Sequence, residues 1–340
     1  MNDIPNEHAG PTLENAMEKP ADEAGENNPA ISPTPESVTP AEPITKAPLA
    51  DEAVLSRTRS MWREVDPTDP SDPVDPTDKS LKQGNCGEII LGASRRGRSH
   101  AYDGKYREDA FSIEVAGAWI LAAVADGTGS KPYARVGSRI AAGSALGYIK
   151  TRLAGLTSAE RVPSTLRGAL AGGMVHALAE ISDEAASRLK EANDFATTLL
   201  LVIYGVYDAK QWLGFAQVGD GGIAIQKMDG ECVQVGQADH GQFGGEAIFL
   251  TSQEAQMSWG KRVQVYEVKE AFQRLIMATD GVFDDFSLPF GQMERLFQEL
   301  QPIGELADPA NWLLEWLNYE RRGSFDDRTL VVITPGKISF

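Results

Sequence analysis

Short apolar runs separated by polar turns dominate the chain from Asn85 onward. Ten such runs are rich in residues that favour β-strands and are separated by glycine and acidic turns: GEIILGAS, AFSIEVA, AWILAAVAD, FATTLLLVIYGVY, QWLGFAQVGD, GGIAIQKM, ECVQVGQ, RVQVYEV, QRLIMATD and RTLVVIT. Runs of this length and composition are typical of β-strands. Ten strands in one domain predict stacked sheets.

A helical period of apolar residues replaces the short runs in four segments, 134–153, 165–191, 291–300 and 309–320. Two long helices therefore fall between early strands, and two shorter ones lie near the end. This order predicts an α+β fold, a four-layer α-β-β-α sandwich in which helices flank two antiparallel sheets, rather than a doubly wound parallel sheet.

The N-terminal part of the chain has a different composition. Thirteen of the 19 prolines fall within residues 1–80, and residues 66–78 form the near-repeat DPTDPSDPVDPTD. Such a segment buries too little apolar surface to offset its chain entropy. We therefore expect a disordered, acidic, Pro-rich tail over residues 1–82 and one folded domain over 83–340. Within the tail, residues 49–65 have the pattern of a short amphipathic helix, either a transient helix in a linker or a docking motif.

Charge and cysteine content narrow the class of protein. Residues 1–80 hold 17 acidic and 6 basic side chains, which accounts for −11 of the net charge of −17. No basic face is evident, so nucleic-acid binding is not expected. Cys86 and Cys232 stand alone and are interpreted as reduced thiols. Without an N-terminal signal or a long apolar stretch, the sequence predicts a soluble cytoplasmic protein with no membrane association.

Acidic residues recur at the ends of the predicted strands. They are Asp126, Asp220 and Asp280, each followed by glycine after an apolar run, and the pairs Glu108–Asp109 and Asp326–Asp327, each just before a run. Strand packing brings residues from distant sequence positions together at such ends. Each Asp-Gly alone is more often a hairpin turn than a ligand, so only their joint occurrence indicates a site.

A cluster of these carboxylates would repel itself strongly unless a cation lay between them. Oxygen ligands without nearby histidine or cysteine suit Mg²⁺ or Mn²⁺ better than zinc. Two such ions bridged by a carboxylate can deprotonate a water and stabilise charge on a phosphoryl group. The pattern therefore points to hydrolytic phosphate chemistry.

Six ordered motifs resemble those of the type 2C (PPM-type) metal-dependent Ser/Thr protein phosphatases. They are REDAF, VADGTGS, DFATTLL, VGDGGIAI, ATDGVFDDF and FDDRTLVVI. The upstream GRSHAYDGKYREDAF, with Ser99 and His100, is most similar to a bacterial branch of that family. The resemblance covers Asn85 to the C-terminus and none of the tail.

The resemblance implies a role for each matched acid. Asp126 would bridge two metal ions, with the Gly127 carbonyl as a further ligand. Asp280 and Asp326 would complete the shell of one ion, and Glu108 would bind the other directly or through water. Asp126 and Asp280 are therefore the principal catalytic candidates.

Three further assignments come from the same resemblance. Asp109 would support the water shell of the second ion. Asp220, together with Asp280, would form a third and weaker metal position. The Thr197–Thr198 pair matches a packing motif beneath the site, which gives it a structural role.

The chain departs from the family pattern at two positions. Many members have histidine where this chain has Thr128, and many have arginine where it has Gly104. His100, Arg98 and Arg107 are the nearby candidates for gripping a substrate phosphate. A lone histidine in a loop is more often a solvated side chain, so both interpretations of His100 stay open.

The function implied is hydrolysis of phosphoserine or phosphothreonine in proteins by a hydroxide that bridges two Mg²⁺ or Mn²⁺ ions, with room for a third. Family analogy alone adds a cognate Ser/Thr kinase, or its targets, as partner. One alternative is a catalytically inactive phosphatase-like module that binds a phosphoprotein or kinase. Another is a scaffold that serves the tail.

Overall fold

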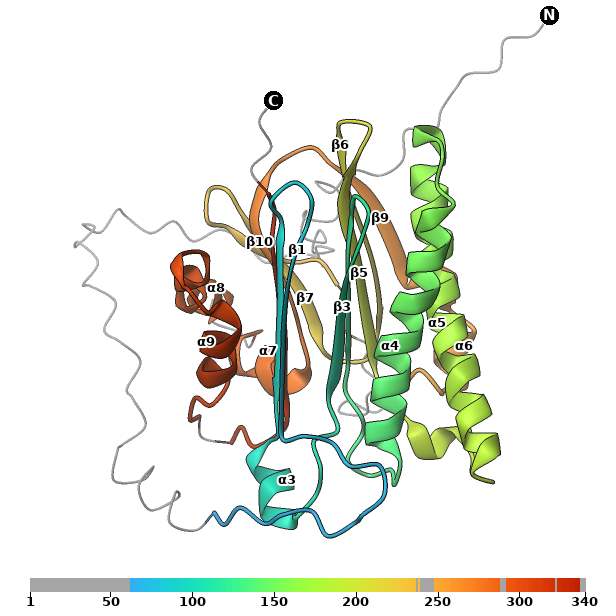
Figure 1. Cartoon of the computed structure of the whole chain (residues 1–340), viewed down its shortest axis with the longest axis vertical. Helices are drawn as coiled ribbons and strands as arrows, with labels where there is room; N and C mark the ends of the chain where they lie inside the picture. Colours follow the sequence, from blue (N-terminus) through green and yellow to red (C-terminus); the bar gives the residue numbers. More distant parts are fainter. Residues whose placement is uncertain (1–61, 237, 239–247, 288–291, 322, 337–340) are drawn as a thin grey trace, which may run out of the picture.

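The computed structural model of the chain (Figure 1) describes residues 62–236, 238, 248–287, 292–321 and 323–336. The expected tail up to residue 61, and with it most of the expected helix at 49–65, lies outside the described residues. Within them, no helix is long and apolar enough to cross a membrane.

Two sheets with only antiparallel neighbours form the centre of the molecule (Figure 1). One sheet has the order β1-β2-β11-β10-β7-β8, with strands Thr77–Gln83, Ile89–Arg95, Arg328–Thr334, Phe272–Ala278, Gly222–Lys227 and Cys232–Gln234. The other has the order β3-β4-β5-β6-β9, with strands Ala110–Ala116, Trp119–Ala125, Leu199–Tyr207, Lys210–Val218 and Val263–Val268. All ten expected strands are therefore present.

Helices cover both outer faces (Figure 1). The α-helices are α3 Arg98–Asp103, α4 Ala134–Ala154, α5 Val162–Ser187, α6 Gln253–Gln256, α7 Asp280–Ser287, α8 Gln292–Glu299 and α9 Pro309–Trp316. Short 3-10 turns are η1 Ala159–Arg161, η2 Ala192–Phe195, η3 Trp259–Lys261 and η4 Gln301–Glu305. Helices α4, α5, α8 and α9 match the expected four, so the predicted α-β-β-α sandwich is confirmed.

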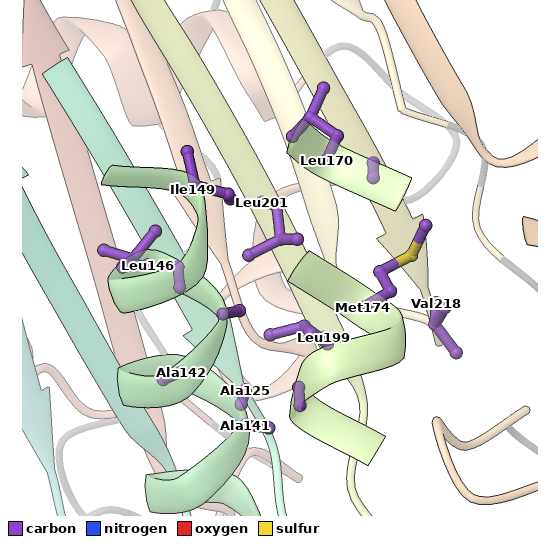
Figure 2. Packing of buried hydrophobic residues seen from close by; sticks show 14 of the residues in the cluster. Ala125, Ala141, Ala142, Leu146, Ile149, Leu170, Met174, Leu199, Leu201 and Val218 are labelled. Carbon is purple, nitrogen blue, oxygen red and sulfur yellow. The ribbon is translucent and has the colours of Figure 1, made fainter. Parts of the chain in front are cut away.

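Alternation along the strands separates the core into layers. On β5, Leu199 and Leu201 face α4 and α5, whereas Leu200 and Val202 face the other sheet. Figure 2 shows the first of these layers, where leucines of β5 meet Leu146 and Ile149 of α4 and Leu170 and Met174 of α5. Because β5 is buried on both faces, its sequence is an almost unbroken apolar run.

The expected tail boundary at residue 82 differs from the structure. Strand β1 lies inside the segment assigned to the tail and pairs with β2 over its full length, from Thr77–Arg95 to Gln83–Ile89. Residues 62–76, which lead into β1, also contact the domain and are called the strap below. The sequence missed both because their partners, β2 and several distant arginines, are not local in sequence.

Candidate metal centre

Strand register brings the predicted acids to one end of the sandwich. In the five-stranded sheet Ala110 pairs with Ala125, so Asp109 and Asp126 emerge side by side just beyond that pair. In the six-stranded sheet Ala278 of β10 pairs with both Gly222 of β7 and Leu330 of β11. The residues just beyond β10, before β7 and before β11 are therefore neighbours too.

Asp126, Asp220 and Asp280 form one compact group. Each offers a carboxylate oxygen, and these oxygens all lie within 4.8 Å of one another. The three side chains come from the end of β4, the crossover from β6 to β7, and the start of α7. A cavity of about 330 Å³ lies beside them and is lined in part by Asp280 and Asp326.

The backbone of Asp126 is fixed from below by the two threonines that precede β5. The Asp126 carbonyl accepts hydrogen bonds from the Thr197 hydroxyl and the Thr198 N–H, each at 2.8 Å, and its own N–H donates to Thr198 Oγ1 at 2.9 Å. A Cβ on Gly127 would lie 2.7 Å from the Ala134 carbonyl. Only glycine therefore fits where the chain turns from β4 toward α4.

Asp280 begins a helix that the sequence analysis did not predict. Helix α7 starts at this residue and packs against β10 and β11. A Cβ on Gly281 would lie 2.0 Å from the Asp327 carbonyl oxygen, so this glycine permits the close approach of the loop before β11.

A second group of possible ligands consists of His100, Asp326 and Asp327. His100 is 8% exposed on α3; its Nδ1 lies 2.9 Å from Asp327 Oδ1 and its Nε2 lies 3.7 Å from Glu108 Oε2. The Asp327 carboxylate also accepts from the backbone N–H groups of Gly97 and Glu108, both at 2.6 Å. In the sequence, Asp327 is only the second acid of the Asp326–Asp327 pair; its place directly before a strand is the signal that could have identified it.

Asp109 faces inward between the two sheets. Its Oδ2 accepts from the hydroxyls of Thr279 at 2.8 Å and Thr329 at 2.7 Å, and the side chain is almost fully buried. The residue therefore ties β3 to the ends of β10 and β11.

The electrostatics of the first group show a surplus of negative charge. Burial, with the nearby carboxylates of Asp280 and Asp109, holds the pKa of Asp126 well above its ordinary value. Burial, with Asp326 and Asp220, raises the pKa of Asp280 to about 7. The charged side chains that act most strongly on both are other acids, so these carboxylates disfavour one another's ionised forms.

The second group contains its own compensating charge. Burial alone would lower the pKa of His100, but contact with Asp327 and the charge of Glu108 raise it to about 9. Burial raises the pKa of Glu108 to about 7, although His100 opposes that rise. Glu108 Oε2 is buried and has no hydrogen-bond partner among the residues that the structure describes.

The other candidates for gripping a phosphate are already engaged. Arg98 pairs with Glu320 at 2.5 Å at the rim. Arg107 is 5% exposed, and its Nε donates to the Asp75 carbonyl of the strap at 3.2 Å. The Thr128 hydroxyl lies 3.2 Å from that of Ser130, and Gly104 ends α3 in the left-handed conformation.

The donor set fits hard divalent cations. Three part-buried carboxylates converge within 4.8 Å of one another, and a further carboxylate oxygen, on Glu108, is buried and lacks a hydrogen-bond partner in the described part of the chain. Oxygen donors of this kind are those that Mg²⁺ and Mn²⁺ prefer.

Comparison with known proteins yields one family. The family model described as Protein phosphatase 2C matches residues 96–318. A search of curated proteins gives no match.

Among solved structures, a serine-threonine phosphatase 2C from Toxoplasma gondii superposes with a TM-score of 0.53 and 16% identity, over 77% of this chain and 99% of its own. A C. elegans sex determining protein superposes with a TM-score of 0.52 and 13% identity, over 72% of this chain and 64% of its own. The Mycobacterium tuberculosis serine/threonine phosphatase PstP/Ppp gives a TM-score of 0.46 and 20% identity, over 74% and 99%. The first two superpositions show that this chain shares their fold.

Proposed function

Because the chain belongs to the protein phosphatase 2C family, we propose that it removes phosphate from phosphoserine or phosphothreonine in proteins. The observation that carries this proposal is the convergence of Asp126, Asp220 and Asp280, whose carboxylate oxygens lie within 4.8 Å of one another, with neighbouring acids raising the pKa of Asp126 and Asp280. Carboxylates this close repel one another when ionised, and a cation bound among them would remove that cost, which supports a metal site here.

The proposed ligands are shared between two metal-ion positions. Asp126 would serve both, with the Gly127 carbonyl as a further ligand. Asp280 and Asp326 would complete one position, and Glu108 would serve the other directly or through water. When bound, a pair of Mn²⁺ or Mg²⁺ ions supplies a deprotonated shared water as nucleophile and neutralises the phosphoryl oxygens.

Two outer acids have supporting roles in this proposal. Asp220 contributes to a third, weaker position together with Asp280. Asp109, which the hydroxyls of Thr279 and Thr329 hold in place, supports water around the second ion. The phosphorylated substrate, and a cognate Ser/Thr kinase as partner, follow from family analogy.

Removal of divalent cations tests the proposal directly. We expect release of phosphate from a phosphothreonine peptide to fall below about 1% of the Mn²⁺-loaded rate in excess EDTA, because the nucleophile and the charge neutralisation are lost together. Added Mn²⁺ should restore the rate. Undiminished turnover in EDTA would contradict the metal-dependent mechanism, whereas Mn²⁺ binding without turnover on any phosphoprotein would favour the inactive binding module.

His100 is proposed to position Glu108 rather than to meet the phosphate, because both ring nitrogens face carboxylates. We expect His100→Asn to weaken Mn²⁺ binding about 10- to 100-fold, as for other groups that orient metal ligands. Raising the Mn²⁺ concentration should recover most of the turnover. A lower rate at saturating Mn²⁺ with unchanged Mn²⁺ affinity would instead assign His100 a direct catalytic role.

A further inference from the structure

The strap, residues 62–76, crosses the end of the molecule that carries α3 and the metal centre (Figure 1). Aspartate precedes proline at positions 66, 69, 72 and 75 within it. Proline favours extended backbone and keeps the chain from folding onto itself. An aspartate is thus presented at every third position.

Two of these aspartates are bound by arginines, one in α4 and one directly after α5. Asp72 forms a two-pronged contact with Arg188, in which Nη2 donates to Oδ1 at 2.8 Å. Asp69 Oδ2 accepts from Arg135 Nη2 at 2.7 Å, and Arg135 also donates to the Ser71 carbonyl at 2.9 Å. Both Asp72 and Arg188 are largely shielded from solvent, with side chains 17% and 27% exposed. Paired, part-buried contacts of this kind are stronger than surface ion pairs.

Asp72 also has an unusual backbone conformation. Its φ is 46°, a left-handed value that costs energy for most residues other than glycine. The contact with Arg188 offsets this cost, which identifies Asp72 as the main anchor of the strap.

Three other strap contacts fall on residues adjacent in sequence to the metal centre. The Val65 N–H donates to the Ala101 carbonyl at 2.8 Å, beside His100. The Asp75 carbonyl accepts from Arg107, beside Glu108. The Trp62 ring packs on Phe325, beside Asp326, with centroids 4.9 Å apart. The strap therefore contacts α3, the 105–109 segment and the loop before β11, and links the three.

We propose that the strap is a positioning element of the metal centre, which holds α3 and the Tyr106–Asp109 segment where Glu108 can bind a cation. Undocking of the strap then loosens this half of the site and weakens its affinity for divalent cations. The inference rests on the proposed metal centre, but it does not require that the protein be an active phosphatase. It also makes residues 62–76 part of the folded unit.

The test uses the full chain and asparagine variants. Asp72→Asn removes the charge while keeping a residue that tolerates positive φ. Asp69→Asn is a milder variant, because that carboxylate is half exposed. Asp66→Asn is the matched control, since the Asp66 side chain makes no hydrogen bond or ion pair with any described residue. Arg188→Gln and the double variant with Asp72→Asn complete a mutant cycle.

Two measurements are needed: hydrogen exchange of the metal-free protein and titration with Mn²⁺. In EDTA, hydrogen exchange of residues 105–109 should become about tenfold faster in Asp72→Asn, because an undocked strap no longer holds Arg107, and the segment that carries Glu108 opens more often. Calorimetric Mn²⁺ titration should show roughly 3- to 10-fold weaker binding, less than for a direct partner of a ligand. The double variant should bind Mn²⁺ no more weakly, and exchange no faster, than either single variant.

The possible results distinguish failure of the strap proposal from failure of the proposed phosphatase function. The role of the strap would be overturned if Asp72→Asn had the same hydrogen-exchange rates and the same Mn²⁺ affinity as Asp66→Asn. It would also be overturned if the losses in the Asp72–Arg188 mutant cycle were fully additive. If Asp72→Asn does not fold, the same comparison is made with Asp69→Asn. A wild-type chain that binds Mn²⁺ but hydrolyses no phosphoprotein would end the proposed phosphatase function and leave the strap inference intact. A wild-type chain that binds no Mn²⁺ would overturn both.

Discussion

Asp126→Asn is expected to lower kcat/KM for a phosphothreonine peptide by roughly 10³-fold or more, beyond the 10- to 100-fold typical of residues that only orient a ligand. The proposed reason is that Asp126 serves both cation positions, so the amide weakens them together. The metal-free variant should melt at the same temperature or higher, because one part-buried carboxylate that repels its neighbours has been neutralised. Steady-state kinetics and thermal melting in EDTA measure the two effects.

The matched control is Asp229→Asn. Asp229 is also followed by glycine, but it lies in the exposed turn between β7 and β8, where its Oδ1 accepts from the Glu231 N–H at 2.9 Å. Turnover should be unchanged in this variant. Equal activity in Asp126→Asn and Asp229→Asn would show that the carboxylate group has no part in catalysis.

This pair of variants also shows how far the sequence could predict the site. Asp229–Gly230 is an ordinary hairpin turn, the more common meaning of the dipeptide. The three site aspartates are not in hairpins: Asp126 leads toward α4, Asp220 lies where the chain crosses between sheets, and Asp280 starts α7. Local sequence cannot distinguish these cases, so the joint pattern and the family resemblance were needed.

The elements that the sequence missed depend on contacts with distant residues. Strand β1 has few apolar positions and forms at the sheet edge by pairing with β2 on one side only. The strap docks because Arg135 and Arg188 lie where its aspartates pass. By contrast, β5 and α5 were predictable because their own apolar patterns match the layers that bury them.

Metal-free protein is expected to lose stability as the pH rises from about 4 to 9. A carboxyl group whose pKa is raised in the folded state holds its proton after the unfolded chain has released it, so raising the pH favours unfolding. For Asp280 the pKa rises from 3.8 to about 7, which corresponds to a loss of about 4 kcal/mol of unfolding free energy across that interval. His100 adds to the trend, since its pKa of about 9 gives stability that is complete below 6.5 and lost toward 9.

Mn²⁺ should reverse this trend, because a cation bound among the acids favours their ionised forms, and protons compete with it less as the pH rises. At a hundred times the dissociation constant, Mn²⁺ should add about 2.7 kcal/mol to the free energy of unfolding. Denaturant titrations in EDTA and in MnCl₂ between pH 5 and 8 measure both effects, and the stabilisation by Mn²⁺ should be larger at pH 8 than at pH 5. Asp280→Asn should flatten the EDTA curve, since it removes a group with a raised pKa. If stability in EDTA instead rose with pH, the part-buried carboxylates could not lie as close together as the structure places them, and the proposed cation site would lose its physical basis.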